Sequence, residues 1–162
     1  TLVTPNITNI QNVDDIRTTG LEIAFADSDV LIPGLDVSAS VTYADSEIVR
    51  NDKFAASVGK RQPRVPNWRA NLLLSYRITD KFSSSLGIRY SGKQFSALDN
   101  SDVNASTYFG FSDFLVADLR LRYQVARQWS AAIGIDNLNN KKYWAFHPYT
   151  QRSVVAELKF DF

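Results

Sequence analysis

The nine residues from Trp68 to Tyr76, WRANLLLSY, alternate between two kinds of side chain. The apolar and aromatic set is Trp68, Ala70, Leu72, Leu74 and Tyr76. The set between them is mostly polar: Arg69, Asn71, Leu73 and Ser75. Side chains of a β-strand point alternately to the two faces of its sheet, so this period of two predicts a strand with one apolar face.

The same period recurs along the chain and predicts seven strands. They are expected at residues 13–25, 35–43, 68–76, 82–90, 115–123, 129–135 and 153–162. Aromatic and β-branched residues are frequent in them, and no stretch of comparable length has helical spacing. The sequence therefore predicts an all-β protein.

The expected connections alternate in length. Residues 27–34, 79–81 and 126–128 are short turns, whereas residues 46–66, 92–112 and 139–152 form long polar and aromatic loops. Short turns on one side and long loops on the other are typical of an antiparallel up-and-down barrel of the outer membrane. No internal domain boundary is expected.

Composition excludes several classes of function. The 162 residues hold 18 Lys and Arg against 17 Asp and Glu, so the net charge of +1 gives no electrostatic reason to expect nucleic acid as a partner. The absence of Cys excludes disulfides, thiolate zinc sites and cysteine nucleophiles. A single histidine, His147, leaves no two-histidine metal site. We expect no metal, no cofactor and no enzyme activity.

The alternation alone also fits a soluble ligand-binding barrel, which would need no detergent. Two further features favour a transmembrane barrel. Aromatic residues bracket the apolar positions, as expected at both boundaries of a bilayer; they are Tyr43, Trp68 and Tyr90 near the long loops, and Tyr76, Phe82, Tyr123, Trp129 and Phe162 near the short turns. Most apolar sets also span eight residue steps, which correspond to a rise of about 20 Å in a tilted strand.

Four segments resemble TonB-dependent outer-membrane receptors. Residues 13–22 resemble the family's N-V-x-x-x-R-x-x-G-x-E strand, and residues 135–143 resemble its penultimate v-x-N-L-f-d-K-x-Y strand. Arg152 and Ser153, before an alternating strand that ends in Phe162, resemble the closing G-R-s strand. Pro63 and Pro66 fit the P-x-x-P entry to a descending strand. The chain departs from these patterns at Asn139, where Phe is common, and at Gln151, where Gly is common.

The resemblance implies a barrel of about 22 strands, of which this chain supplies about seven. Residues 1–162 would be the C-terminal part of the transmembrane barrel, and the N-terminal plug and the TonB-contact region would lie outside them. The alternative is a complete eight-stranded outer-membrane barrel with a structural or adhesin role. It would need an eighth strand at Thr1–Ile10, where Pro5 and the missing alternation oppose one.

By the same resemblance, the parent protein would be a bacterial outer-membrane receptor that takes up a scarce nutrient, energised by the TonB complex. The expected cargo is an iron chelate, a ferric siderophore first, with haem, cobalamin, other metal chelates and oligosaccharides as alternatives. Aromatic loop residues are the candidate ligand contacts: Tyr108, Phe109, Phe111, Trp144, Phe146, His147 and Tyr149. Packing within the loops is the alternative role for these rings.

Two further groups of residues have expected partners. The barrel-assembly machinery would read the last strand through Phe160 and Phe162. Charges on the lumen face would pair across strands or with the plug; they are Arg69, Arg77, Arg89, Asp118, Arg120, Arg122, Glu157 and Lys159. Membrane lipid is the expected partner of the apolar face.

Overall fold

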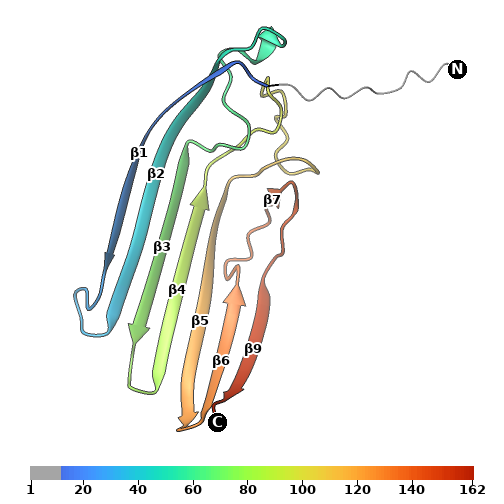
Figure 1. Cartoon of the computed structure of the whole chain (residues 1–162). Coiled ribbons are helices and arrows are strands. Elements are labelled where there is room, and N and C mark those ends of the chain that lie inside the picture. Colours follow the sequence, from blue (N-terminus) through green and yellow to red (C-terminus); the bar gives the residue numbers. More distant parts are fainter. Residues whose placement is uncertain (1–11) are drawn as a thin grey trace, which may run out of the picture.

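The computed structural model describes residues 12–162 and shows one antiparallel sheet (Figure 1). Its seven strands, in spatial order, are β1 (Asp15–Asp27), β2 (Leu35–Arg50), β3 (Trp68–Arg77), β4 (Phe82–Ser91), β5 (Phe114–Ala126), β6 (Trp129–Asp136) and β9 (Ser153–Phe160). Each large strand pairs with the next one along the chain, which confirms the up-and-down topology. The possible strand at Thr1–Ile10 lies outside the described residues.

The two ends of the sheet differ, as expected (Figure 1). Residues 28–34, 78–81 and 127–128 are short turns at one end, and residues 51–67, 92–113 and 137–152 are long loops at the other. The first long loop contains the 3₁₀ turn η1 (Ala55–Ser57), and the third contains a small hairpin of β7 (Trp144–Ala145) and β8 (His147–Pro148). Between residues 12 and 162 no helix is long and apolar enough to cross a membrane.

The strand register gathers the apolar side chains on one face, which we call the apolar face. One row across the strands is Phe25, Ala39, Leu72, Ile88 and Ala117, and the next is Val37, Leu74, Leu86, Leu119, Ile135 and Val154. Many of these side chains are exposed. Among residues 12–162 few apolar side chains are buried: Ile48, Val116, Tyr143 and Pro66. Nothing in the described part of the chain covers the apolar face.

Aromatic rings bound the apolar face at both ends. At the loop end, the rings of Tyr43 and Trp68 lie 4.8 Å apart. At the turn end, Phe82 faces Tyr123 on β5 with ring centroids 6.4 Å apart. The two aromatic boundaries predicted from the sequence are therefore present as cross-strand neighbours.

The opposite, polar face carries cross-strand ion pairs. Arg89 of β4 bonds Asp118 of β5 at 3.0 Å, and Arg77 of β3 approaches Asp36 of β2 at 3.4 Å. A third pair joins Arg120 of β5 to Asp136 of β6. These contacts confirm the expected pairing across strands. Lys159 instead pairs with Asp161 near the end of its own strand, and within residues 12–162 no ion pair involves Arg69, Arg122 or Glu157.

Two glycines allow close approaches in the sheet. A Cβ atom on Gly20 would lie 2.5 Å from the main-chain oxygen of Tyr43, so any side chain there would push β1 away from β2. This contact gives a physical reason for the glycine in the R-x-x-G-x-E pattern. At Gly134 a Cβ atom would lie 2.8 Å from Nε of Arg120, so the missing side chain leaves room for the arginine that reaches Asp136.

Two strand ends differ from the sequence prediction. β2 continues to Arg50, although a loop was expected from residue 46. Polar contacts hold this extension: the Thr18 and Ser46 hydroxyl groups lie 2.7 Å apart, and Arg50 bonds Asp15 at 2.8 Å. The period of two is hidden there because buried Ser46 is polar. The last strand was expected to reach Phe162, but β9 ends at Phe160.

Candidate ligand-binding site

Main-chain hydrogen bonds join the second and third long loops. The Phe109 amide donates to the Phe146 carbonyl at 2.8 Å, and the Phe146 amide donates to Gly110 at 2.9 Å. The Ser112 amide donates to Trp144 at 2.9 Å, and Phe111 and Ala145 form an isolated antiparallel bridge. The two loops that carry the candidate aromatic residues are thus fastened together.

Five of the seven candidate side chains meet in one group, which we call the aromatic cluster. Tyr108 contacts Trp144 and His147, with ring centroids 5.3 and 5.7 Å apart. Phe146 contacts Phe109 at 4.7 Å and His147 at 4.6 Å. All four contacts are edge-to-face, the geometry that the charge distribution of aromatic rings favours. The Tyr108 and Phe109 rings stay more than half exposed.

The other two candidates make different contacts. Phe111 lies beneath the guanidinium of Arg64, which is 5.7 Å from its ring centroid. Tyr149 stacks on Tyr143 with centroids 4.8 Å apart. Both side chains brace the loops, which is the alternative role considered for the aromatic residues.

The backbone is strained at the centre of the cluster. Phe109 and Phe146 have φ angles of 65° and 71°. These angles lie in the left-handed region, which residues other than Gly, Asn and Asp rarely adopt. Such conformations cost on the order of 1–3 kcal/mol each and persist where surrounding contacts hold them. Here the amides of both residues bond the facing loop and their rings pack together. The exposed rings are therefore prearranged in position.

Tyr143, a buried residue of the third loop beside Tyr149, was not among the candidate residues. Its side chain is buried, 4.5 Å from the Phe114 ring and 4.8 Å from Tyr149. Burial raises the pKa of the Tyr143 phenol above its ordinary value. The sequence feature that could have identified Tyr143 is its position as the final Tyr of the pattern at residues 135–143.

Asn137 ties the third loop to the polar face. Its side chain donates to the Lys141 carbonyl at 2.8 Å and accepts from the Lys141 amide at 2.8 Å. It also reaches the Thr150 carbonyl at 3.3 Å. Its own amide donates to Asp118, the carboxylate that pairs with Arg89. One buried asparagine thus closes the loop and connects it to a lumen-face ion pair.

Asn139 stands where the receptor pattern commonly has Phe, and its contacts give the substitution a structural role. Its side-chain nitrogen donates to the Leu115 carbonyl at 2.8 Å, and its side-chain oxygen accepts from the Ala117 amide at 3.2 Å. The β5 residues before Leu119 have no partner on β6. The Asn139 side chain bonds two of them, so it continues the pairing of β5 past the end of β6.

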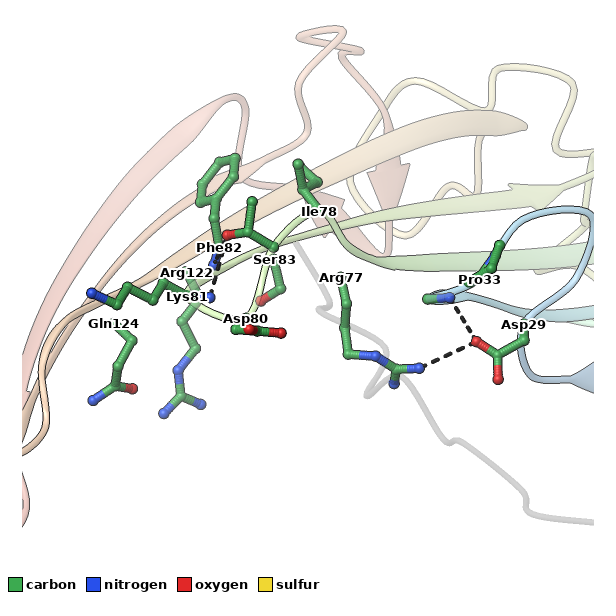
Figure 2. Close-up of a pocket in the computed structure, with 12 residues that line it drawn as sticks. Asp29, Pro33, Arg77, Ile78, Asp80, Lys81, Phe82, Ser83, Arg122 and Gln124 are labelled. Atoms are coloured by element: carbon green, nitrogen blue, oxygen red, sulfur yellow. Dashed lines mark hydrogen bonds and ion pairs between the residues drawn. The ribbon is translucent and has the colours of Figure 1, made fainter.

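Several cavities lie on the polar side of the sheet, among them one at each end. One of about 290 Å³ is lined by Arg89, Asp118, Tyr143 and Tyr149 and adjoins the base of the third loop. A larger one of about 740 Å³ lies at the opposite, short-turn end, far along the strands from the aromatic cluster. Figure 2 shows Arg77 and Arg122 directed to one side of the sheet there, and Phe82 and Ile78 to the other.

The aromatic cluster presents ring faces, ring edges and one imidazole to a ligand. Among residues 12–162 no group of three or more His, Cys, Asp or Glu side chains is placed to hold a metal ion. His147 contacts Tyr108 and Phe146 instead. The arrangement suits the binding of a flat or aromatic ligand by contact with its surface.

Replacing Asn137 by alanine should loosen the third loop. The change leaves the Lys141 amide and two main-chain carbonyls without their partner, at a cost of about 1–3 kcal/mol. Trypsin should then cut the full receptor after Lys141 or Lys142 at least several times faster. Ser153→Ala, at the first residue of β9 directly after the same loop, is the control and should leave cleavage unchanged. Equal cleavage of Asn137→Ala and the unaltered receptor would contradict the assigned role.

The family comparison identifies the class of protein. The family model described as "TonB dependent receptor-like, beta-barrel" matches residues 1–138. The chain belongs to this family. The resemblance drawn from the sequence motifs is therefore confirmed.

Individual relatives are ferric siderophore receptors. The chain is 26% identical to the probable TonB-dependent siderophore receptor PiuA of Acinetobacter baumannii, over 96% of this chain and 22% of that protein. It is 29% identical to the ferripyoverdine receptor of Pseudomonas aeruginosa, over 86% of this chain and 16% of that protein. The chain thus spans 22% and 16% of the length of these two relatives.

Solved structures show the same fold. The crystal structure of the siderophore receptor PiuA from Acinetobacter baumannii superposes with a TM-score of 0.76 at 23% identity, over 90% of this chain and 22% of that one. The ferric-catecholate import receptor Fiu from E. coli K12 gives a TM-score of 0.73 at 24% identity, over 91% of this chain and 21% of that one. The predicted fold, a segment of a larger receptor barrel, is confirmed.

Proposed function

We propose that the chain forms part of the barrel wall of an active-transport receptor in the bacterial outer membrane. The observation that carries this proposal is the apolar face, which no described residue covers and which aromatic rows bound at both ends. In a barrel of this family the face contacts lipid, and the polar face with its ion pairs lines the lumen. The long loops then face outward and the short turns face the periplasm.

The proposed cargo is a ferric siderophore that first contacts the aromatic cluster. Two observations support this assignment. The relatives are receptors for siderophores, and the cluster presents exposed, prearranged rings at the loop end of the sheet. Aromatic rings bind the flat organic groups of an iron chelate through their faces and edges.

The parent protein is proposed to take energy from the TonB complex through a region outside residues 1–162. The same region would contain a plug that fills the lumen, and residues 1–162 would form the C-terminal part of the barrel. The small share of the relatives that this chain covers supports a larger parent. Lumen charges that form no ion pair within residues 12–162, such as Arg122, would then face the plug.

The cargo proposal is tested by removing two rings from the cluster. In the full receptor, Tyr108→Ala with Trp144→Ala should weaken binding of ferric siderophore by about tenfold or more, since each ring contact contributes about 0.5–1.5 kcal/mol. The measurement is binding of ⁵⁵Fe-loaded siderophore to whole cells, with surface receptor counted by antibody. Val103→Ala, an exposed residue of the second loop, is the control. Equal affinity of the double variant and the control would reject the cluster as the cargo contact.

The assembly proposal concerns Phe160 and Phe162. Phe160 contacts Trp129 at 4.8 Å and Phe162 at 5.0 Å, while the Phe162 ring is fully exposed. If the assembly machinery reads these rings, Phe162→Ala should reduce receptor in outer-membrane fractions several-fold, whereas Asp161→Ala should not. Because an exposed ring adds little to the folded state, molecules that do assemble should keep normal heat resistance. Unchanged membrane levels would remove the assembly role.

A further inference from the structure

A cavity of about 380 Å³ opens beside the aromatic row at the long-loop end of the apolar face. Three of its lining residues are the ring-bearing Tyr43, Trp68 and Tyr90, and two are the cations Arg61 and Lys93. Asn67 and Gly92 complete the lining. The cavity therefore combines an aromatic floor with positive charge, on the side of the sheet that faces away from the lumen.

The floor of this cavity is built by strand pairing. Tyr43 and Trp68 are register partners whose rings lie 4.8 Å apart, and Tyr90 follows on the next strand. Gly92 donates its amide to the Trp68 carbonyl at 2.9 Å, and the absence of a side chain at Gly92 leaves room beside the Tyr90 hydroxyl. Trp68 and Tyr90 stay 49% and 40% exposed, so their rings are free to contact a ligand.

The two cations come from different loops; hydrogen bonds hold the main chain at Arg61, and a cation–π contact holds the Lys93 side chain. The Arg61 amide donates to Oδ1 of Asn100 at 2.9 Å, and Nδ2 of Asn100 donates back to the Arg61 carbonyl at 3.0 Å. The Lys93 ammonium lies 4.8 Å from the ring centroid of Phe95. Between residues 12 and 162 neither cation forms an ion pair with a carboxylate.

The nearby carboxylates on the same face do not neutralise the site. Glu47 lies opposite Arg61 in an isolated antiparallel bridge, but its carboxylate pairs with Arg17 at 3.2 Å. Asp45 lies one strand step beyond Tyr43 on this face, is exposed and does not line the cavity. The site therefore keeps a positive charge, which complements an anion.

We propose that this cavity, the rim site, binds the anionic phosphate head group of an outer-leaflet membrane lipid. The proposal rests on the proposed function, because it needs the apolar face to contact lipid. Hydrocarbon chains would lie along the apolar face below the aromatic row, and the phosphate would lie between Arg61 and Lys93 above it. Aromatic rings at head-group depth with basic residues just beyond them favour such a lipid over a soluble anion, which gains nothing from the ring floor.

The test uses the full receptor in an uncharged detergent and native mass spectrometry with added lipids. The probes are phosphatidylglycerol, diphosphorylated lipid A and, as the zwitterionic comparison, phosphatidylcholine. The two anionic lipids should bind more tightly than phosphatidylcholine. In the double variant Arg61→Gln with Lys93→Gln, the preference for anionic lipid should fall by about thirtyfold. Each cation near the membrane surface strengthens binding of anionic lipid by about fivefold.

A matched control removes the same charge at the same end of the sheet. Lys53→Gln with Lys142→Gln replaces two exposed loop cations outside the rim site and should keep the preference. Equal loss in the two double variants, or no loss in the rim variant, would overturn the proposal. So would displacement of the lipid by millimolar inorganic phosphate, because that result would indicate a simple anion site.

Two further readouts separate folding and cargo binding from lipid binding. Heat modifiability on gels shows whether each variant is a folded barrel, and the single changes Arg61→Gln and Lys93→Gln should each give an intermediate loss if the double variant folds poorly. Binding of ferric siderophore to the aromatic cluster should be unchanged in the rim variants. A receptor that binds anionic lipid but no siderophore would contradict the cargo proposal and leave the rim site supported.

Discussion

Arginine at Leu72 should make folding of the full receptor into a bilayer less favourable by about 2–4 kcal/mol, whereas arginine at the adjacent Leu73 should cost clearly less. Leu72 lies on the apolar face, in the row with Ala39 and Ile88, midway between Trp68 and Tyr76 on its strand. A cation there would enter hydrocarbon near the bilayer centre. Leu73 lies on the polar face and is 48% exposed, so arginine there would enter a wet lumen.

The pair is a matched control because both positions hold leucine on the same strand. Val116 also lies on the polar face, but it is 1% exposed, so arginine there would be costly for reasons of packing alone. The measurement is equilibrium refolding of each variant into lipid vesicles against denaturant. Equal losses at Leu72 and Leu73 would contradict the assignment of the two faces, and a larger loss at Leu73 would reverse it.

The strands could be predicted because their pattern depends on one local rule. Each apolar set in the sequence, such as Leu35 to Tyr43, reappears on the apolar face, since alternation follows directly from the geometry of an extended chain. The rule failed beyond Tyr43, where β2 continues. Ser46 is buried there among polar partners, and a buried polar side chain carries no sign of its burial in a pattern of hydropathy.

The candidate site was predicted only as a set of residue types. The aromatic residues of two loops could be named from the sequence, but nothing in it indicated that Phe109 and Phe146 would face each other. Their meeting depends on left-handed backbone at both residues and on hydrogen bonds between loops more than 30 residues apart. The rim site was missed for a similar reason, because Arg61 is positioned by the side chain of Asn100, 39 residues away.

Two residues of the family patterns have physical roles that the patterns themselves do not show. Gly20 and Asn137 were noticed because they fit family patterns. The structure supplies the reason for each: an oxygen atom too close for any side chain at Gly20, and a set of loop hydrogen bonds at Asn137. The same bonds explain why Asn139 can occupy a position where Phe is common, because its amide pairs with β5.

Produced alone in detergent or lipid, the 162-residue chain should fail to form a monomeric barrel. β1 and β9 lie at opposite edges of the sheet and do not pair with each other (Figure 1). β1 has 13 residues, and alternate residues direct an amide and a carbonyl group outward at its free edge. Unsatisfied backbone groups in hydrocarbon cost several kcal/mol each. The total cost of two open edges exceeds the stability of about 5–15 kcal/mol that is usual for a folded domain.

This prediction separates the receptor segment from the alternative of a complete small barrel. A complete barrel would migrate as one heat-modifiable species on gels and sediment as a monomer, with slow amide exchange in β1 and β9. A segment of a larger wall should aggregate or associate through its edges. It should form a heat-modifiable barrel only when the remaining strands are supplied, for example by the full receptor sequence. Because the seven strands are fixed by alternation in either case, the state of their two edges decides between these structures.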